Sequence, residues 1–434
     1  MFPDLPRRDP GAEPIGTLAS TLVRSAGSSG NNRTIPAGYT YLGQFLDHDI
    51  TFDPTSKLQR DNDPSALVNF RTPRFDLDSV YGSGPADQPF LYDWDAAPAP
   101  GVKLLVDADP PDAAAAGLDL PRNHQHRALI GDARNDENLI IAQLHLLFLR
   151  FHNRVVDVVD AARPSLAAAE LLEEAQRIVR WHYQWIVMHD FLPRIVGHPL
   201  PDEHGAFAWR DEPFMPVEFS GAAFRFGHSM VRESYKLNDG PAVPVFRPRR
   251  RSGRHLGGAR RLPRELEIDW ERFFRLAGAR PPTSSMQIDL SLSEALSELP
   301  DGTALARRNL ERGRALGLPA GRDVANAMGE EPLTDDELLD PLPRRLDPTT
   351  REAMLHATPL WYYVLLEAQL RGGEGEHLGP VGGRIVAEVM VGLLEGDPQS
   401  YRRQWPEWTP ELPGATAEDF TMGDLVHFTL DGEE

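Results

Sequence analysis

The sequence predicts a mainly α-helical protein with very little β structure, and three observations carry that prediction. Residues 136–161 and 166–196 repeat apolar side chains at the spacing of a buried helix face. Strand-like patterns are scarce, the clearest being the short segment 102–107. The chain also contains no internal repeat, so an array of small stacked units is not expected.

The remaining segments are interpreted in chain order. Residues 1–38 are rich in Pro, Gly, Ser and Asn, so we expect an extended N-terminal arm there. Residues 43–85 mix short apolar pieces with many aspartates, and residues 86–127 carry Pro and Ala clusters typical of surface loops with one hairpin. Further helices are expected over 219–231, 292–299, 303–316, 350–372 and 382–396.

Charge restricts the classes of partner. Asp and Glu outnumber Lys and Arg by 65 to 45 among 434 residues, which gives a formal net charge of -20. An acidic surface of this kind disfavours nucleic acid and anionic membranes. The segment 247–264 departs from the acidic average because arginines are interleaved there with Gly and Pro. A solvated loop and a docking site for an acidic partner both remain open for it.

Cysteine is absent, which excludes disulfides, thiolate catalysis, cysteine-held zinc and iron–sulfur clusters. The N-terminus MFPDLPRRDPGAEPIG has no apolar core of the kind found in signal peptides. No apolar run approaches the roughly 18–20 residues of a membrane-spanning helix. The compartment and the oligomeric state stay unknown on this basis; a cytoplasmic location is favoured, and secretion without a signal peptide is compatible with the sequence.

The first candidate site is the stretch Gln44-Phe45-Leu46-Asp47-His48-Asp49. Neutral imidazole accepts a proton near neutral pH, so a histidine between two carboxylates can act as a base. The same arrangement also suits a metal ligand, or a surface histidine with acidic neighbours. The pattern by itself leaves these three interpretations of His48 open.

A second pattern, Thr72-Pro73-Arg74-Phe75-Asp76-Leu77-Asp78, places hard oxygen ligands in one short loop. Two carboxylates at alternate positions, with a hydroxyl four residues before the first, suit calcium, which also binds backbone carbonyls. An ordinary turn explains the pattern as well, because turns contain many aspartates for their own hydrogen bonds.

The stretch GDARNDE at 131–137 precedes the first long helix. Arg134 is a permanent cation near a helix N-terminus, where the helix dipole disfavours it. An ion pair with Asp132 or Asp136 would explain its position, and so would a function. His145 and His152 share one face of the following helix, and we expect both to be packed, hydrogen-bonded core histidines.

Two patterns follow in the second half of the chain. In FRFGHSMV, Gly227 removes a side chain beside His228, so a flat and bulky group can approach the imidazole. A histidine in such an apolar context is otherwise usually structural. The last pattern is NLERGR, which begins at Asn309 and precedes Gly317-Leu318-Pro319.

Taken together and in this order, the patterns resemble the animal-type haem peroxidases of the peroxidase–cyclooxygenase superfamily. The resemblance covers roughly residues 36–410, through YLGQFLDHDITFDP, SVYGSG, GDARNDEN, LHLLFLRFHNRVVD, FRFGHSMV and NLERGRALGLP. It implies the animal haem peroxidase fold, with a single domain over residues 1–434 in which a helical core surrounds a buried haem.

Carried over position by position, the resemblance implies a haem site and a calcium site. His48 would be the distal acid and base, with Arg134 as its cationic partner and Gln44 in the same pocket. His228 would be the proximal iron ligand, oriented by Asn309. The residues that would hold the haem are Arg225 and Arg312, beside its propionates, and Asp47 and Glu137, through esters to its methyl groups. The implied calcium ligands are Asp49, Thr72, Arg74 through its carbonyl, Asp76 and Asp78.

The implied activity is a peroxidase that reduces hydrogen peroxide and oxidises halide, thiocyanate or small organic donors through a ferryl intermediate. Its cofactors would be ester-linked haem b and Ca2+. Asn138 stands where some members have a methionine that forms a third haem link, so chloride oxidation is not expected. One alternative is a fatty-acid oxygenase, whose radical tyrosine is replaced here by Arg225. The other is a non-catalytic relative, against which the retention of His48 and His228 argues.

Overall fold

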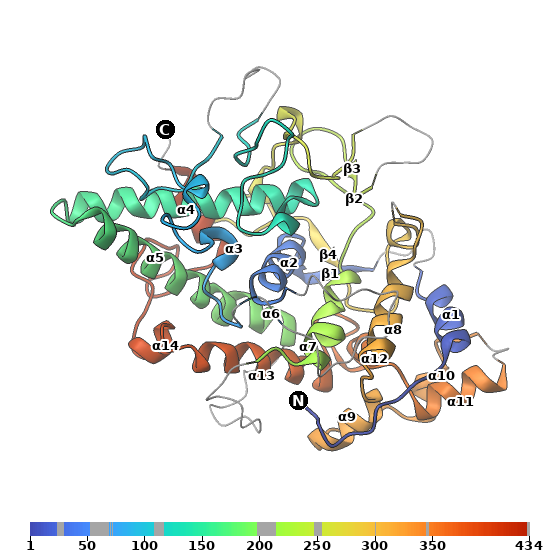
Figure 1. Ribbon diagram of the computed structural model, residues 1–434. Coiled ribbons are helices and arrows are strands. Elements are labelled where there is room, and N and C mark those ends of the chain that lie inside the picture. Colours follow the sequence, from blue (N-terminus) through green and yellow to red (C-terminus); the bar gives the residue numbers. More distant parts are fainter. Residues whose placement is uncertain are drawn as a thin grey trace.

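The structure, a computed structural model, describes residues 1–23, 30–52, 69, 71, 73–107, 117–197, 214–246, 254–299, 301–343 and 347–431 (Figure 1). Helices are the dominant elements of this part of the chain. Its strands form two short antiparallel pairs, β1 (Asn31–Pro36) with β4 (Ser284–Met286) and β2 (Ser234–Tyr235) with β3 (Val243–Pro244). The prediction of a mainly α fold with very little β structure is therefore confirmed.

Helix α2 (Gly38–Ile50) lies in the middle of the molecule, with α4 (Leu139–Ala162) above it and α13 (Pro380–Gly396) below it in Figure 1. α2 packs against α4 and also against η5 (Ala223–His228), a 3-10 turn from a distant part of the chain. Its apolar side chains, such as Phe45, are fully buried. A central buried helix therefore carries the motif around His48, and the sequence pattern does not predict this helix because aspartates interrupt it.

The two long helical patterns of the sequence are both confirmed. The first forms α4, which begins where the side chain of Asn138 accepts hydrogen bonds from the next turn of backbone. The second forms α5 (Ala168–Trp185), a π-helical turn η4 (Ile186–Phe191) and α6 (Leu192–Val196) in direct succession. α5 packs along α4, so the pair forms one wall of the core.

The helix expected over 350–372 is wrong in its continuity, because it forms two helices, α11 (Pro348–His356) and α12 (Leu360–Arg371). The break lies at Pro359, which has no amide hydrogen and disfavours helical backbone at the residue before it. Segment 219–231 is similarly divided between α7 (Val217–Gly221) and η5. Segments 303–316 and 382–396 form α8 (Leu305–Ala315) and α13, and segment 292–299 forms only the 3-10 turn η8 (Glu294–Leu296).

The expectation of an extended arm over residues 1–38 is wrong for two of its parts. Residues Ala12–Thr21 form helix α1, and strand β1 occupies Asn31–Pro36. Ile15 and Leu18 explain the helix, because they lie one turn apart and are both buried against the core. The Pro and Gly content of this region marks the ends of its elements rather than their absence.

The strand expected over 102–107 is also wrong, since only isolated bridges occur there, Tyr92 with Leu104 and Asp107 with Asp119. The side chain of Asn153 explains this, because it binds both peptide groups of Leu104. Its Oδ1 accepts from the Leu104 amide at 2.7 Å, and its Nδ2 donates to the Leu104 carbonyl at 2.8 Å. A side chain thus takes the place of a neighbouring strand.

The other helices complete the shell around this core, and none in the described part of the chain has the length and hydrophobicity needed to cross a bilayer. The remaining α-helices are α3 (Asp78–Tyr81), α9 (Gly321–Met328), α10 (Asp335–Leu339), α14 (Tyr401–Gln404) and α15 (Met422–Leu430). The remaining 3-10 turns are η2 (Pro89–Leu91), η3 (Ala133–Asp136), η6 (Arg264–Leu266) and η7 (Trp270–Arg272).

Candidate active site

His48 lies buried near the C-terminal end of α2, with its Nδ1 2.7 Å from Oδ1 of Asn135 in η3. An amide oxygen only accepts hydrogen bonds, so this contact makes Nδ1 the protonated nitrogen of His48. Its Nε2 then carries the lone pair. Burial lowers the pKa of His48, and the positive charge of Arg134 lowers it further. The imidazole is therefore neutral at neutral pH and able to accept a proton at Nε2.

Arg134 binds the carbonyl end of α2, which explains a cation at the start of the next helical segment. Its Nη2 donates to the carbonyl of His48 at 2.9 Å and to the carbonyl of Thr51. These are helix-end carbonyls, where the dipole favours positive charge. Asp132 completes the set, because its carboxylate accepts from Nη2 at 2.7 Å. The expected ion pair of Arg134 is thus the one with Asp132, whereas Asp136 pairs with Arg122.

Helix α2 presents Gln44 and Asp47 on the same face as His48, and Glu137 contacts Gln44. Gln44 donates through Nε2 to the carboxylate of Glu137, and its Oε1 lies 3.4 Å from Nδ2 of Asn138. The side chain of Glu137 has accessible surface, yet burial raises its pKa to about 6 and the nearby charge of Asp47 raises it too. The Glu137 carboxyl is therefore accessible and still close to other charged side chains.

His228 is the last residue of η5, and its Nδ1 lies 2.8 Å from Nδ2 of Asn309 on α8. A half-turn of this amide presents Oδ1 instead of Nδ2 to the same nitrogen. Among the described residues, no partner reaches Nε2 of His228. Burial lowers the pKa of His228 to about 3, and the charge of Arg225 adds to this effect. The ring is therefore neutral, with one nitrogen uncommitted.

The space beside His228 is open. A Cβ atom added to Gly227 would meet no heavy atom within 4 Å. Arg225 donates from Nε to the carbonyl of Ser220 at 2.8 Å, and Arg312 follows Asn309 by one turn of α8. Charge from both arginines reaches His228. An uncommitted imidazole nitrogen, an open flank and two cations nearby fit a planar group that carries a metal and carboxylates.

The charge of Asp47 connects the two histidines. It raises the pKa of His48 and that of His228, and it also acts on Arg225. This agrees with the direct packing of α2 against η5. The residues expected on the distal and proximal sides therefore lie around one interior region, although they come from distant parts of the sequence.

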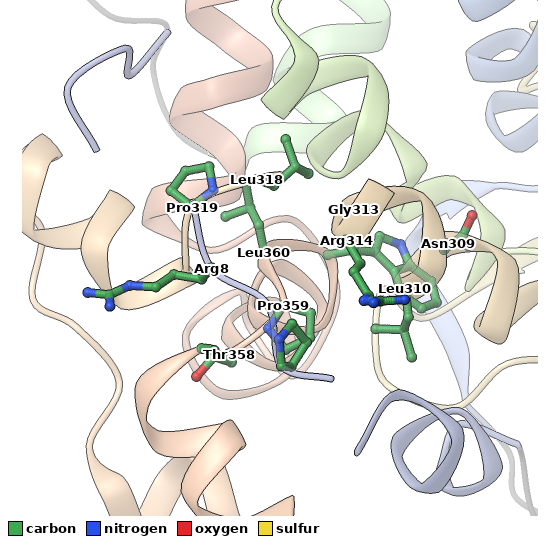
Figure 2. A pocket seen from close by; sticks show the side chains of 13 residues that line it. Arg8, Asn309, Leu310, Gly313, Arg314, Leu318, Pro319, Thr358, Pro359 and Leu360 are labelled. Carbon is green, nitrogen blue, oxygen red and sulfur yellow. The ribbon is translucent and has the colours of Figure 1, made fainter. Parts of the chain in front are cut away.

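A small cavity of about 20 Å³ lies behind Asn309, between α8 and the N-terminal segment (Figure 2). Such a volume holds about one water molecule, so no organic group fits there. Arg8 and Arg314 tie the N-terminal segment down through ion pairs with Asp323 and Asp9, both at 2.9 Å. Asn309 thus lines a space between α8, the N-terminal segment and residues 357–361 that is too small for a cofactor.

Three carboxylates form a cluster that includes one residue of α2. Asp49, Asp76 and Asp78 each offer an oxygen, and these atoms lie within 4.8 Å of one another. Asp49 also accepts from the hydroxyls of Ser79 at 2.9 Å and Tyr183 at 3.1 Å. Burial raises the pKa of all three carboxyls, that of Asp76 to about 7, and their mutual repulsion adds to the effect for Asp49 and Asp76. A divalent cation would relieve this repulsion.

The two remaining expected calcium ligands are not brought into this cluster by any described contact. Thr72 lies outside the described residues. The Nε of Arg74 lies 3.8 Å from the carboxylate of Asp397, and its carbonyl oxygen has no hydrogen bond among the described residues. A carbonyl without a hydrogen-bond partner remains compatible with a role as a metal ligand.

Comparison with known proteins identifies the family of this chain. The family model described as animal haem peroxidase matches residues 56–406, which is most of the chain. The chain belongs to the animal haem peroxidase family. It is 29% identical to thyroid peroxidase of Sus scrofa over 386 residues, which cover 82% of this chain and 40% of that protein. It is 28% identical to chorion peroxidase of Drosophila melanogaster over 300 residues, which cover 62% of this chain and 34% of that protein.

This member of the animal haem peroxidase family thus spans less than half the length of those relatives. Among solved structures, it resembles peroxidase A from Dictyostelium discoideum, with a TM-score of 0.62 and 17% identity over 95% of this chain and 90% of that one. It also resembles a fatty acid alpha-dioxygenase of Arabidopsis thaliana, with a TM-score of 0.61 and 14% identity over 95% and 80%. At such low identity, these structures show a shared fold alone.

Sequence reasoning missed one contact in this haem peroxidase family member. His152 pairs both ring nitrogens, with the Tyr81 hydroxyl at 3.1 Å and the Val102 carbonyl at 2.9 Å, as expected of a core histidine. His145 is equally buried, but its Nδ1 lies 3.0 Å from Nδ2 of Asn135. Its partner is therefore the residue that also binds His48. No signal in the sequence marks this link beyond the position of Asn135 next to Arg134.

The described part of the Arg-rich segment fits a solvated loop. Arg260 donates to carbonyls of its own loop, at His255 and Gly257. Arg261 forms an ion pair with Asp107 at 2.8 Å, and Arg254 lies 3.8 Å from Glu265. Residues 247–253 lie outside the described residues.

Proposed function

We propose that this chain is a haem-dependent peroxidase that reduces hydrogen peroxide and oxidises a small donor. The observation that carries the proposal is the arrangement of two neutral histidines around one interior region. Each of them has Nδ1 held by an asparagine amide, His48 at 2.7 Å and His228 at 2.8 Å. One imidazole is thus prepared to accept a proton and the other to bind a metal, which is the division of roles that peroxide reduction requires.

The proximal residues would hold the cofactor, haem b. Nε2 of His228 would bind the iron, with Oδ1 of Asn309 accepting the hydrogen of Nδ1 so that the ligand stays oriented and electron-rich. Arg225 and Arg312 would pair with the haem carboxylates, since their charge already reaches His228. When bound, haem supplies an iron centre that takes up two oxidising equivalents from peroxide. Asp47 and Glu137 would form ester bonds to its methyl groups.

The distal residues would move the proton. Nε2 of His48 accepts a proton from hydrogen peroxide and returns it to the oxygen that leaves, so it acts first as a base and then as an acid. Arg134 keeps a positive charge beside His48, where negative charge develops as the oxygens separate. Its hydrogen bonds to the end of α2 fix that charge in position. Gln44 would line the same pocket.

The carboxylate cluster supports a calcium site that stabilises the distal helix. Asp49 immediately follows His48, so a cation bound by Asp49, Asp76 and Asp78 would fix the end of α2. The hydroxyl of Thr72 and the carbonyl of Arg74 would complete a shell of oxygen ligands. This set requires ionised carboxylates, and their raised pKa values mean that protons compete with the cation at low pH.

The fold likeness to alpha-dioxygenases makes fatty-acid oxygenation the second candidate function. The two are separated by a donor screen on the haem-loaded protein. We expect the haem absorption band to shift on addition of peroxide and to return when bromide, iodide, thiocyanate or a phenol is oxidised. Oxygen uptake that depends on a fatty acid, without oxidation of these donors, would contradict the peroxidase proposal. Mass spectrometry after acid–organic extraction tests the esters, which predict that haem stays with the protein after turnover.

A further inference from the structure

Two histidines on one face of α4 have different surroundings. His152 uses both ring nitrogens in bonds to the scaffold, and so does His182 of α5, with the Ile178 carbonyl and the Leu412 amide. His145 is fully buried, but its Nε2 has no hydrogen-bond partner in the part of the chain that the structure describes. An unsatisfied buried ring nitrogen is costly, and a histidine kept only for packing would be paired on both sides, as the other two are.

The partner of His145 explains why it differs. Asn135 is itself fully buried and lies between two imidazoles, accepting at Oδ1 from His48 and donating from Nδ2 to Nδ1 of His145. The oxygen and nitrogen ends of the Asn135 amide have nearly the same shape, so both orientations of the amide fit the site. With Oδ1 facing His48, Nδ2 faces Nδ1 of His145, which accepts from it when the hydrogen of that ring is on Nε2.

We propose that Asn135 and His145 are positioning residues that hold His48 in the tautomer with its lone pair on Nε2. This inference rests on the proposed function, because it assigns a role toward the base of that same site. If the amide turned over, Nδ2 would donate to Nδ1 of His48, and the hydrogen of the imidazole would move to Nε2. That tautomer cannot accept a proton from peroxide. A relay of three side chains thus sets which nitrogen of His48 is basic.

The test compares variants that change either the hydrogen bond to Nδ1 of His48 or the support of that bond by His145. Asn135→Leu removes the acceptor, and we expect the reaction with peroxide to slow by about 100-fold per bound haem, within the range of acid–base catalysis. His145→Phe leaves the amide free to turn, so a loss of about 2-fold is expected, given that roughly half the population then holds the wrong tautomer. Asn135→Asp offers an oxygen in either orientation and should retain the rate.

The double variant Asn135→Asp/His145→Phe is decisive. A carboxylate needs no orienting partner, so it should restore most of the rate that His145→Phe loses. A merely structural role predicts a lower rate in the double variant than in His145→Phe, because the effects of two changes in a buried site would add. His152→Phe is the matched control, since it removes a buried imidazole from the same helix face without touching Asn135, and its rate per haem should equal that of the unaltered protein.

Cyanide provides a readout other than turnover. Hydrogen cyanide must give up its proton to bind iron, so its association rate depends on the same basic nitrogen of His48. We expect the cyanide association rates of the variants to follow the order of their peroxide rates, while haem content and thermal unfolding do not. If Asn135→Leu does not fold, the comparison of His145→Phe with the double variant answers the same question.

The outcomes separate this inference from the proposed function. Unchanged rates in Asn135→Leu and His145→Phe, with a slow His48→Ala, would overturn the positioning role alone. Equal losses in Asn135→Leu and Asn135→Asp, or no recovery in the double variant, would also overturn it. A normal rate in His48→Ala would overturn both, because His48 would then not be the base.

Discussion

In the proposed site, the distal histidine and the proximal histidine are supported differently. In both, an asparagine amide holds Nδ1 of a histidine, with Asn135 bound to His48 and Asn309 bound to His228. On the distal side the amide is itself held by a second imidazole, that of His145. Among the described residues, no second imidazole contacts the amide of Asn309.

The difference follows from what each nitrogen has to do. A proximal ligand is oriented in part by the metal bond that it forms, so one amide on a rigid helix is enough. A base has no permanent partner at its reactive nitrogen, so its tautomer depends entirely on the other side of the ring. A histidine that accepts protons therefore needs more hydrogen-bonded side chains behind it than a histidine that binds a metal.

The largest expected effect separates the two halves directly. His228→Ala should abolish stable haem binding, because the proposed proximal ligand is removed, whereas His48→Ala should keep haem and slow the reaction with peroxide by roughly 10²–10⁴-fold. Haem content is measured from the haem absorption band relative to protein absorbance. The rate follows from stopped-flow mixing with peroxide.

A cavity variant controls for damage to the fold. His228→Gly with added imidazole should regain the haem band, since the free ring can occupy the space of the lost side chain. Equal haem loss in the two alanine variants would contradict the division of roles between the halves.

A smaller effect is expected from calcium, and only on the distal half. Removal of calcium by a chelator should lower the unfolding temperature, because an ion present at 100 times its dissociation constant stabilises the folded state by about 2.7 kcal/mol. The rate with peroxide should fall as well, since Asp49 adjoins His48, while the haem stays bound to His228. Asp78→Asn should make the unfolding temperature independent of calcium. If a chelator released haem but left the rate per haem unchanged, calcium would act on the proximal half, which contradicts the prediction.

The sequence predicts the chemistry of this site better than its geometry. His48, Asp49, Arg134 and His228 stand out because their residue types carry chemistry, and their roles toward haem and calcium stay predictions. The role of Asn135 could not be predicted, because an asparagine before a helix is ordinary and its two partners become neighbours only after folding. Sequence patterns therefore do not predict contacts between residues far apart in the chain, or hydrogen bonds from side chains to the backbone.

The same limit explains the errors in the fold. Helix α2 carries Asp47 and Asp49 on either side of His48 near its end, and only the burial of most of its residues shows that it is central. The segment around Leu104 has strand-like composition, but Asn153 binds its peptide groups before a strand can. In contrast, α4 and α5 are predicted well, because their own periodicity determines which face is buried.

The last expected effect concerns acid stability, and it compares His145 with His152, the two histidines of α4. Burial lowers the pKa of His145 to about 3 and that of His152 to about 4, whereas an unfolded imidazole titrates near 6.5. As the pH falls below about 6.5, the unfolded state therefore binds protons that the folded state does not. Each histidine thus contributes a loss of stability toward acid, up to about 1.4 kcal/mol per pH unit.

His145→Phe and His152→Phe should each remove one such proton, so the free energy of unfolding would depend less steeply on pH between about 6 and 4. Urea unfolding at a series of pH values measures the two slopes. We expect them to flatten equally, although only His145→Phe slows the reaction with peroxide. A flattened slope in one variant alone would mean that the other imidazole is already charged in the folded protein. Equal slopes with unequal rates would show that His145 differs from His152 through Asn135 and not through burial.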